Sequence, residues 1–139
     1  MTEITLDLDK CSYYSLMKRI DKIKKYEQFK EFLVSQSCKM NGYHIKIKSK
    51  RRLKANAVYN IRFNLGDDNR RIIRDMLGYP KSIMFDYKLE TIVDSKGIML
   101  YSYLWEKTPM MLYIRNQIDN QWRVIHLNKR NLKIFTQKR

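Results

Sequence analysis

Asp7 and Asp9, two aspartates separated by one residue near the start of the chain, have the side chains and spacing that metal chemistry requires. They belong to residues 4–9, where apolar and polar side chains alternate as in a strand with one buried face. On such a strand both carboxylates share the polar face, about 7 Å apart, and can reach one divalent cation or a pair of cations. A solvated strand edge shows the same pattern, so the pair alone leaves both interpretations open.

Two later segments repeat the alternation of apolar and polar side chains. Residues 43–48 and 82–88 are each predicted to form a strand with one apolar face and one polar face. The predicted polar positions of these two strands are His44, Lys46, Lys48, Asp86 and Lys88. If helices cover the apolar faces, the polar faces of all three strands meet on one open surface.

This open surface predicts a site for metal and phosphate. Asp7, Asp9 and Asp86 would bind Mg²⁺ or Mn²⁺, which prefer oxygen ligands, and His44 would contact a phosphate. The lysines of the same faces would contact phosphate oxygens. Cross-strand ion pairs on a solvated sheet face would account for the same charges without catalysis, and this alternative stays open.

The charge of the chain indicates a polyanionic partner. Lys and Arg number 29 against 14 Asp and Glu, which gives a net charge of +15 on 139 residues. Such a field attracts nucleic acid first and an anionic membrane surface second. A run that we call the basic loop follows residues 43–48 and is a predicted phosphate contact, although a solvated charge run has the same composition. Its basic residues are Lys50, Arg51, Arg52 and Lys54.

Hydropathy and cysteine content indicate the compartment. No apolar run approaches the roughly 18 residues of a membrane span and no signal-peptide pattern is visible, so we expect no membrane association. Cys11 and Cys38 follow no metal-ligand spacing and are interpreted as reduced thiols. We therefore predict a cytoplasmic location, which for a viral protein means the host cytoplasm.

Helical spacing of apolar residues separates the predicted strands. Ser12 is suited to cap a helix after the first strand, and residues 26–35 are predicted to form a second helix. Residues 57–65 are predicted to form another helix that Gly66 ends, and one of the aspartates at 67–68 caps a short helix after it.

These elements predict an α+β fold in a single domain, residues 1–139. Residues 1–90 would form an RRM-like β-α-β-α-β core with the helices on one sheet face, and residues 91–139 a β-rich meander. The strand-like segments of the meander are residues 99–105, 110–115, 122–127 and 132–135.

The order of the polar motifs resembles the archaeo-eukaryotic primase (primase-polymerase) superfamily, in particular small members from archaeal viruses and plasmids. The resemblance covers about residues 4–88 and comprises Asp-x-Asp at residues 7–9, Gly-Tyr-His-Ile at residues 42–45 and a later aspartate. Residues 65–75 also look like the segment that follows the histidine strand in those proteins. Departures are Gly42-Tyr43 in place of the usual serine, the short chain and the lack of a zinc-binding cysteine cluster.

The resemblance implies roles for these residues. Asp7 and Asp9 would bind the metals and His44 would contact the incoming nucleotide. The third acid would be Asp86 by the strand pattern or Asp75 by the local sequence. The reaction would join the α-phosphate of a nucleotide to a primer 3′-hydroxyl or to a first nucleotide.

We therefore expect a nucleic-acid-binding protein of replication or repair in an archaeal or viral genome, with possible primase-polymerase-like nucleotidyl transfer. The expected partner is single-stranded DNA or a primer-template. Alternatives are a non-catalytic single-strand-binding protein and a small viral inhibitor that binds a host nucleoprotein machine. The aromatic residues that could stack on bases are Tyr13, Tyr14, Tyr101, Tyr103, Trp105 and Trp122.

Overall fold

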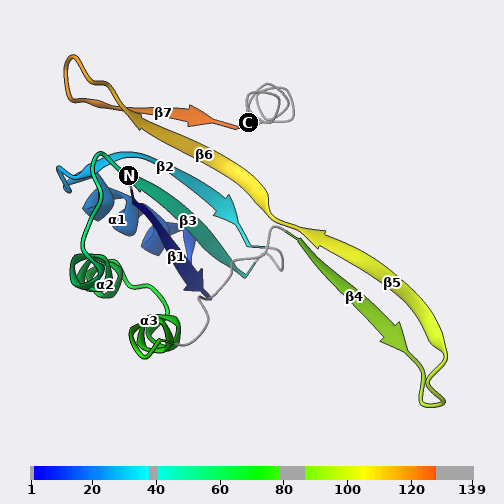
Figure 1. Ribbon diagram of the computed structural model, residues 1–139. Coiled ribbons are helices and arrows are strands. Elements are labelled where there is room, and N and C mark those ends of the chain that lie inside the picture. Colours follow the sequence, from blue (N-terminus) through cyan, green and yellow to red (C-terminus); the bar gives the residue numbers. More distant parts are fainter. Residues whose placement is uncertain (1, 38–40, 79–86, 128–139) are drawn as a thin grey trace.

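The computed structural model describes residues 2–37, 41–78 and 87–127, which form three helices and seven strands (Figure 1). The helices are α1 (Tyr13–Lys24), α2 (Ala55–Asn64) and α3 (Asn69–Met76). The strands are β1 (Glu3–Asp9), β2 (Phe29–Gln36), β3 (Gly42–Ser49), β4 (Tyr87–Val93), β5 (Met99–Glu106), β6 (Thr108–Arg115) and β7 (Trp122–His126). This content confirms the predicted α+β class.

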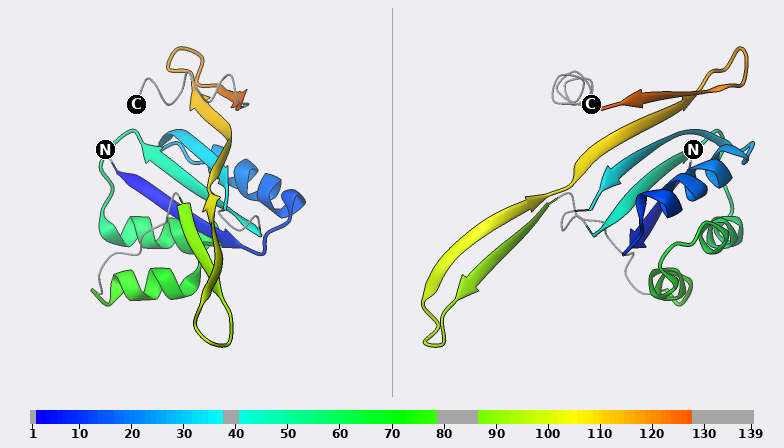
Figure 2. Two further views of the ribbon diagram at one scale, coloured as in Figure 1. Left: turned by 90° about the vertical axis from the view of Figure 1, so that its right-hand side faces the viewer. Right: turned by 180° about the vertical axis from the view of Figure 1, so that it is seen from behind.

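Five of the strands form one sheet in the order β1-β3-β2-β6-β7, and all neighbours in it are antiparallel. β4 and β5 pair only with each other among the described strands. Their hairpin extends away from the body of the molecule as an arm (Figures 1 and 2). The strands of the C-terminal half therefore have two different places: β6 and β7 extend the five-stranded sheet, and β4 and β5 form a separate hairpin.

One face of the five-stranded sheet is apolar and packs against α1 and α2. Ile4, Leu6 and Leu8 of β1 are buried on this face. The helix residues in the same core cluster are Leu16, Ile20, Ile23, Ile61 and Leu65. Burying each of these large side chains contributes roughly 1.5–3 kcal/mol to the stability of the fold. Their burial therefore fixes which side of β1 faces the core. Because side chains alternate along β1, Asp7 and Asp9 are left on the opposite face.

α1 is tied down at both ends by hydrogen bonds. Ser12 is its N-cap, as predicted, and its Oγ accepts a hydrogen bond from the Ser15 amide at 3.1 Å. At the other end the buried guanidinium of Arg115, from β6, donates to the Lys24 carbonyl at 3.0 Å. The Trp122 indole of β7 donates to the same carbonyl, also at 3.0 Å. The two bonds to Lys24 satisfy the last carbonyl group of α1 and join the helix to the last two strands of the sheet.

The predicted helix over residues 26–35 is wrong, because most of this segment forms β2. Phe29 and Phe32 are three residues apart, which is typical of a helical stripe. In the structure the pairing of β2 with β3 shifts register between Phe29 and Glu31, and both phenylalanines are fully buried. An irregularity of this kind puts residues three apart on one strand face. The predicted β-α-β-α-β order therefore gives way to β1-α1-β2-β3-α2-α3, and the RRM-like description of the core is not confirmed.

Most of the other predicted elements are present. α2 (Ala55–Asn64) covers all of the predicted helix except its last residue, and Gly66, whose φ of +79° suits glycine, follows its C-cap Leu65. Asp68, rather than its neighbour, caps α3 by accepting a hydrogen bond from the Arg70 amide. β5, β6 and β7 lie where the strand-like segments of the meander were predicted. Residues 82–86 and 132–135, which were also predicted as strand, lie outside the described residues.

Candidate functional site

The polar residues of β1 and β3 meet on the sheet face away from the helix core. In the β1–β3 pairing Asp7 lies opposite His44, and Asp9 lies opposite Gly42. The His44 Nε2 atom is 3.3 Å from the Asp7 Oδ1 atom. The structure therefore brings together the Asp-x-Asp motif and the histidine that the sequence placed on separate strands.

Gly42 allows this close approach of the two strands. A Cβ atom at position 42 would collide with the carbonyl oxygen of Leu8 and would press on the Asp9 Cα atom. Any side chain at this position would push β3 away from the end of β1. The absence of a side chain at position 42 thus lets β3, the strand that contains His44, lie close to the end of β1 that contains Asp7 and Asp9.

The two aspartates have opposite electrostatic environments. Burial raises the pKa of Asp7, but the imidazole of His44 and the guanidinium of Arg71 outweigh it, so the pKa lies below its ordinary value. Burial raises the pKa of Asp9 above its ordinary value, and the negative charges of Asp7 and Asp68 raise it further. Asp7 therefore favours the ionised form, while Asp9 holds a proton more readily.

Polar atoms at the Asp7–His44 contact lack hydrogen bonds. Within the described part of the chain, the buried Asp7 Oδ1 and His44 Nδ1 atoms have no hydrogen-bond partner. The short Asp7–His44 distance is thus an electrostatic contact without good hydrogen-bond alignment. Such orphaned atoms are costly in a fold, and an ion or ligand is one explanation for them.

The described residues do not complete a metal site. No group of three or more His, Cys, Asp and Glu side chains among them could hold a metal ion. Asp7 and Asp9 supply two carboxylates, whereas the predicted Mg²⁺ or Mn²⁺ site requires a third acid. Asp86 lies outside the described residues, so its role as the third acid stays a prediction.

A buried aspartate behind the site, Asp67, anchors the outer edge of β1, the last strand of the sheet among the described residues. Its side chain is fully buried, and its Oδ1 accepts hydrogen bonds from the Asp7 amide and from Arg71 Nη1, both at 2.8 Å. Its Oδ2 accepts from Arg62 Nε at 2.7 Å. Arg71 Nη2 donates in turn to the Thr5 hydroxyl at 2.9 Å. These bonds fix the backbone of the catalytic candidate Asp7 against the turn between α2 and α3.

Asp75, the other candidate for the third acid, belongs to this ion network. Its Oδ2 accepts a hydrogen bond from Arg62 Nη1 at 2.7 Å. It does not converge with Asp7 and Asp9. The structural role of Asp67 was not predicted from the sequence, although one signal was present: Arg71 follows it by four residues, the spacing of a helical ion pair.

A hollow of about 310 Å³ lies at the end of β1, and both aspartates line it. Its other lining residues are Leu8, Lys10, Cys11, Ser15, Arg19, Gly66 and Asp68. The Arg19 guanidinium packs against Gly66, and its Nε atom is buried without a hydrogen-bond partner in the described residues. The hollow combines carboxylates with two cationic side chains, a set that suits a phosphate group and its counter-cation.

The predicted phosphate contacts on β3 lie in a row that leads away from His44. Lys46 and Lys48 occupy the same face as His44, and Lys48 Nζ is 3.8 Å from Glu31 Oε1 on β2. The basic loop follows the end of β3 and begins about 20 Å from His44 at the usual strand rise. A hollow of about 410 Å³ beside this loop is lined by Glu27, Gln28, Lys50, Arg51, Arg52 and Leu53.

Lys88 does not belong to this row. It lies in β4, opposite Trp105 of β5, and the β4–β5 hairpin is separate from the five-stranded sheet. The prediction that Lys88 shares a polar sheet face with Asp7 and His44 is therefore wrong.

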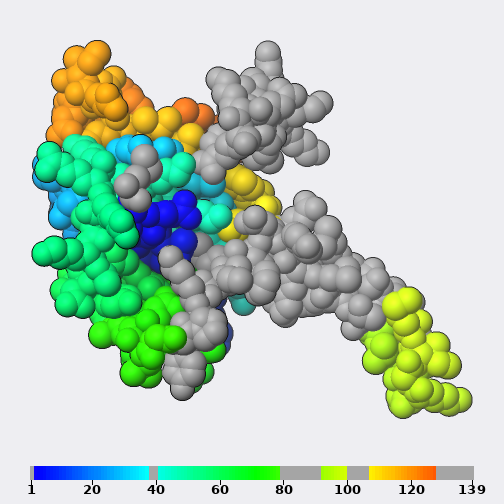
Figure 3. Space-filling view, in the orientation of Figure 1, coloured from blue at the N-terminus to red at the C-terminus, as the bar shows by residue number. Residues whose placement is uncertain are grey.

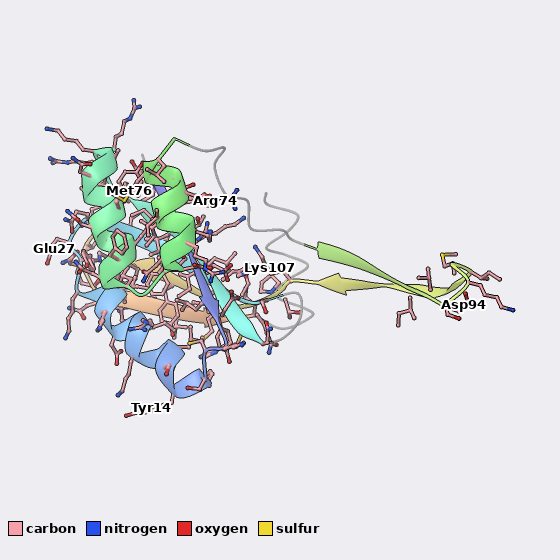
Figure 4. The ribbon with its side chains drawn as sticks, turned by 90° about the horizontal axis from the view of Figure 1, so that it is seen from below. Tyr14, Glu27, Arg74, Met76, Asp94 and Lys107 are labelled. Atoms are coloured by element: carbon pink, nitrogen blue, oxygen red, sulfur yellow. The ribbon has the colours of Figure 1, made fainter. Side chains whose placement is uncertain are left out.

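The aromatic residues proposed for base stacking have different places in the fold. Trp122 packs edge-on against Phe32, with ring centroids 5.2 Å apart, and is part of the core periphery. Tyr14, at the outer side of α1, is 70% exposed and remains available for contact (Figure 4). Tyr101, Tyr103 and Trp105 belong to β5 in the arm.

Comparison with protein-family models, with curated proteins and with solved structures finds no match to this chain. None of the three described helices combines the length and the apolar composition that crossing a membrane requires.

Proposed function

We propose that this protein binds nucleic acid in replication or repair, with a primase-polymerase-like site on the β1–β3 face of its sheet. One observation carries the proposal: Asp7 and His44 lie 3.3 Å apart on neighbouring strands, and the Lys46–Lys48 row begins beside them. A polyanion lying along β3 would meet ammonium groups first and the carboxylate–imidazole pair at the end of its path.

The basic surface supports binding of the phosphate backbone. A net charge of +15 favours association with any polyanion, and the lysines of β3 give that attraction a direction. The exposed basic loop extends the path beyond the sheet. Because these groups contact phosphates and not base edges, the binding would depend weakly on sequence and strongly on salt.

The acidic end of the path supports nucleotidyl transfer as the activity. Asp7 and Asp9, with Asp86 as the predicted third acid, would hold Mg²⁺ or Mn²⁺, which would offset the charge of the phosphates. Asp7 keeps its negative charge at neutral pH because its pKa is lowered by His44 and Arg71 against the effect of burial. The imidazole of His44 would contact a phosphate oxygen of the nucleotide.

A non-catalytic single-strand-binding protein is the second candidate, and one observation favours it. Among the described residues no group of three or more acidic, histidine or cysteine side chains could hold a metal ion, and Asp7 already faces an imidazole. A relative that kept the basic row but lost the third acid would still bind nucleic acid.

The two candidates differ in one assay. The double change Asp7→Asn and Asp9→Asn should abolish Mn²⁺-dependent nucleotide incorporation on a primer-template, with equal or higher DNA affinity because two repelling charges are lost. The double change Glu3→Gln and Asp21→Asn removes the same charge elsewhere and should leave incorporation intact. If the unaltered protein incorporates no nucleotide under any metal condition, the non-catalytic candidate stands.

The binding path has its own test. Lys46→Gln and Lys48→Gln should each reduce the slope of log affinity against log salt by about one. The matched controls are Lys22→Gln in α1, the helix that covers the opposite face, and Lys25→Gln at its C-cap, and they should change the slope less. Equal effects of both pairs would contradict a path along β3.

A further inference from the structure

The β4–β5 arm, residues 87–106, is a surface without a partner in the described part of the molecule. The two strands pair only with each other, so the outer edge of each is unpaired among the described strands. Figures 1 and 2 show the arm extending far from the sheet and helices. A two-stranded hairpin alone in water is marginally stable, so we expect packing against a partner to stabilise the arm.

The tip of the arm is a well-formed turn that displays apolar side chains. The Asp94 carboxylate accepts hydrogen bonds from the amides of Lys96 and Ile98, both at 2.9 Å. Around this turn Val93, Ile98 and Met99 are 54%, 60% and 63% exposed. Asp94 marks the tip in Figure 4, and Figure 3 shows the same end of the arm apart from the body. Exposed apolar groups of this kind mark interaction sites.

The charge of the arm differs from that of the rest of the chain. Its 20 residues contain two lysines and three acidic residues, a net charge of −1, so the remaining residues carry +16. The arm therefore lacks the excess of cations that binding to phosphates requires. Tyr101, Tyr103 and Trp105 stand at alternate positions of β5, a composition typical of protein interfaces.

We propose that the arm is a self-association surface, on which a second copy of this chain packs its own arm. Two chains of net charge +15 repel each other, and the arm is where they can meet without opposing positive charge. The second copy presents the same apolar tip and the same unpaired strand edges, as a two-fold symmetric contact requires. This inference is independent of the proposed function of the β1–β3 face.

The test is sedimentation of the full-length protein, freed of nucleic acid by nuclease, over a wide range of concentration. The unaltered protein should form dimers. The triple change Val93→Ser, Ile98→Ser and Met99→Ser should weaken the dimer about tenfold or more. The matched control replaces three exposed apolar residues of the body, Ile73→Ser, Leu77→Ser and Ile118→Ser, and should leave the dimer intact.

Salt concentration distinguishes self-association from bridging by nucleic acid. A dimer held by the arms, each with a net charge of only −1, should tighten as salt screens the repulsion between the positive bodies. Association through bound nucleic acid should loosen with salt. A monomer at every concentration, equal effects of the two triple variants, or loosening with salt would each overturn the proposal. A nucleic-acid affinity that falls with the tip variant while the dimer persists would overturn it as well.

Discussion

Asp67 and Asp7 lie close together at the edge of β1, and their carboxylates have opposite surroundings. Asp67 is fully buried, and both of its oxygens accept hydrogen bonds, from two arginines and two backbone amides. Asp7 is partly exposed, and its Oδ1 atom has no hydrogen-bond partner among the described residues. The first carboxylate is fully compensated and the second is not.

This difference separates a carboxylate with a structural role from one that can still bind a ligand. A buried charge whose partners are all present stabilises one arrangement of the chain and has no capacity left for a ligand. A carboxylate with an orphaned oxygen can accept a cation or a donor from outside. The Asp67 network therefore positions β1, and in the Asp7–Asp9–His44 group Asp7 retains the capacity for a ligand that the proposed function requires.

Removing the compensated carboxylate should have the largest effect on stability. Asp67→Ala would leave Arg62 buried without its Oδ2 partner and would free the edge amide of Asp7. Breaking a buried ion pair by removing one partner costs about 3–5 kcal/mol. Urea unfolding followed by circular dichroism should show this loss in the free energy of unfolding.

The neighbouring Asp68 is the matched control for that change. It caps α3 with a single side-chain hydrogen bond, and Asp68→Ala should cost only about 1 kcal/mol. Equal losses for the two variants would mean that the Asp67 network contributes no more than an ordinary helix cap.

How far the sequence predicts this arrangement depends on the range of the interactions. Alternation along residues 4–9 and 43–48 correctly predicts which side chains share a face with Asp7, because period and burial are local properties. The register that puts His44 opposite Asp7 depends on the pairing of two strands 37 residues apart, which no local pattern contains. The failure over residues 26–35 has a similar cause, since only the pairing with β3 reveals the register shift beside Phe29.

The buried Asp67 network could not be predicted from the sequence for a different reason. Asp67 and Asp68 are adjacent and chemically identical, and either could cap the helix that follows. Only the packing of the α2–α3 turn against the edge of β1 decides that one carboxylate is buried with Arg62 and the other caps the helix. The arm is also unpredictable locally, because β4 and β5 have the same alternation as the strands of the main sheet.

An intermediate effect should follow from a change that separates Asp7 from His44 without touching Asp67. Gly42→Ala places a methyl group against the Leu8 carbonyl and forces β3 away from the end of β1. Overpacking of this kind costs about 1–3 kcal/mol. Alongside unfolding by urea, the nuclear magnetic resonance signals of the His44 ring should shift, because its distance from the Asp7 carboxylate increases.

The control for that change is a glycine in open space. A methyl group added at Gly97 would meet no atom within 4 Å, but the φ of +81° disfavours alanine, so Gly97→Ala reports backbone strain without a collision. A His44 signal that moves equally in both variants would break the link between Gly42 and the site.

The smallest effect should distinguish the two aspartates of the motif by the sign of their pH dependence. The folded-state pKa of Asp7 is lowered, so its ionised form stabilises the fold above its unfolded pKa of about 3.9 and this contribution is lost as pH falls through the folded value. The folded-state pKa of Asp9 is raised, so its contribution is present below about pH 3.9 and is lost as pH rises through the folded value. Each contribution should be below about 1 kcal/mol, because solvent screens both groups.

At neutral pH, Asp7→Asn should therefore lower the free energy of unfolding and Asp9→Asn should raise it slightly. Urea unfolding of both variants and the unaltered protein across the acidic range, with Glu3→Gln as a control at the other end of β1, measures the two differences. The gap between the two variants should close as pH falls through the carboxyl range, since both aspartates then become protonated in the unaltered protein. Shifts of the same sign in both variants would mean that His44 and Arg71 do not distinguish Asp7 from Asp9.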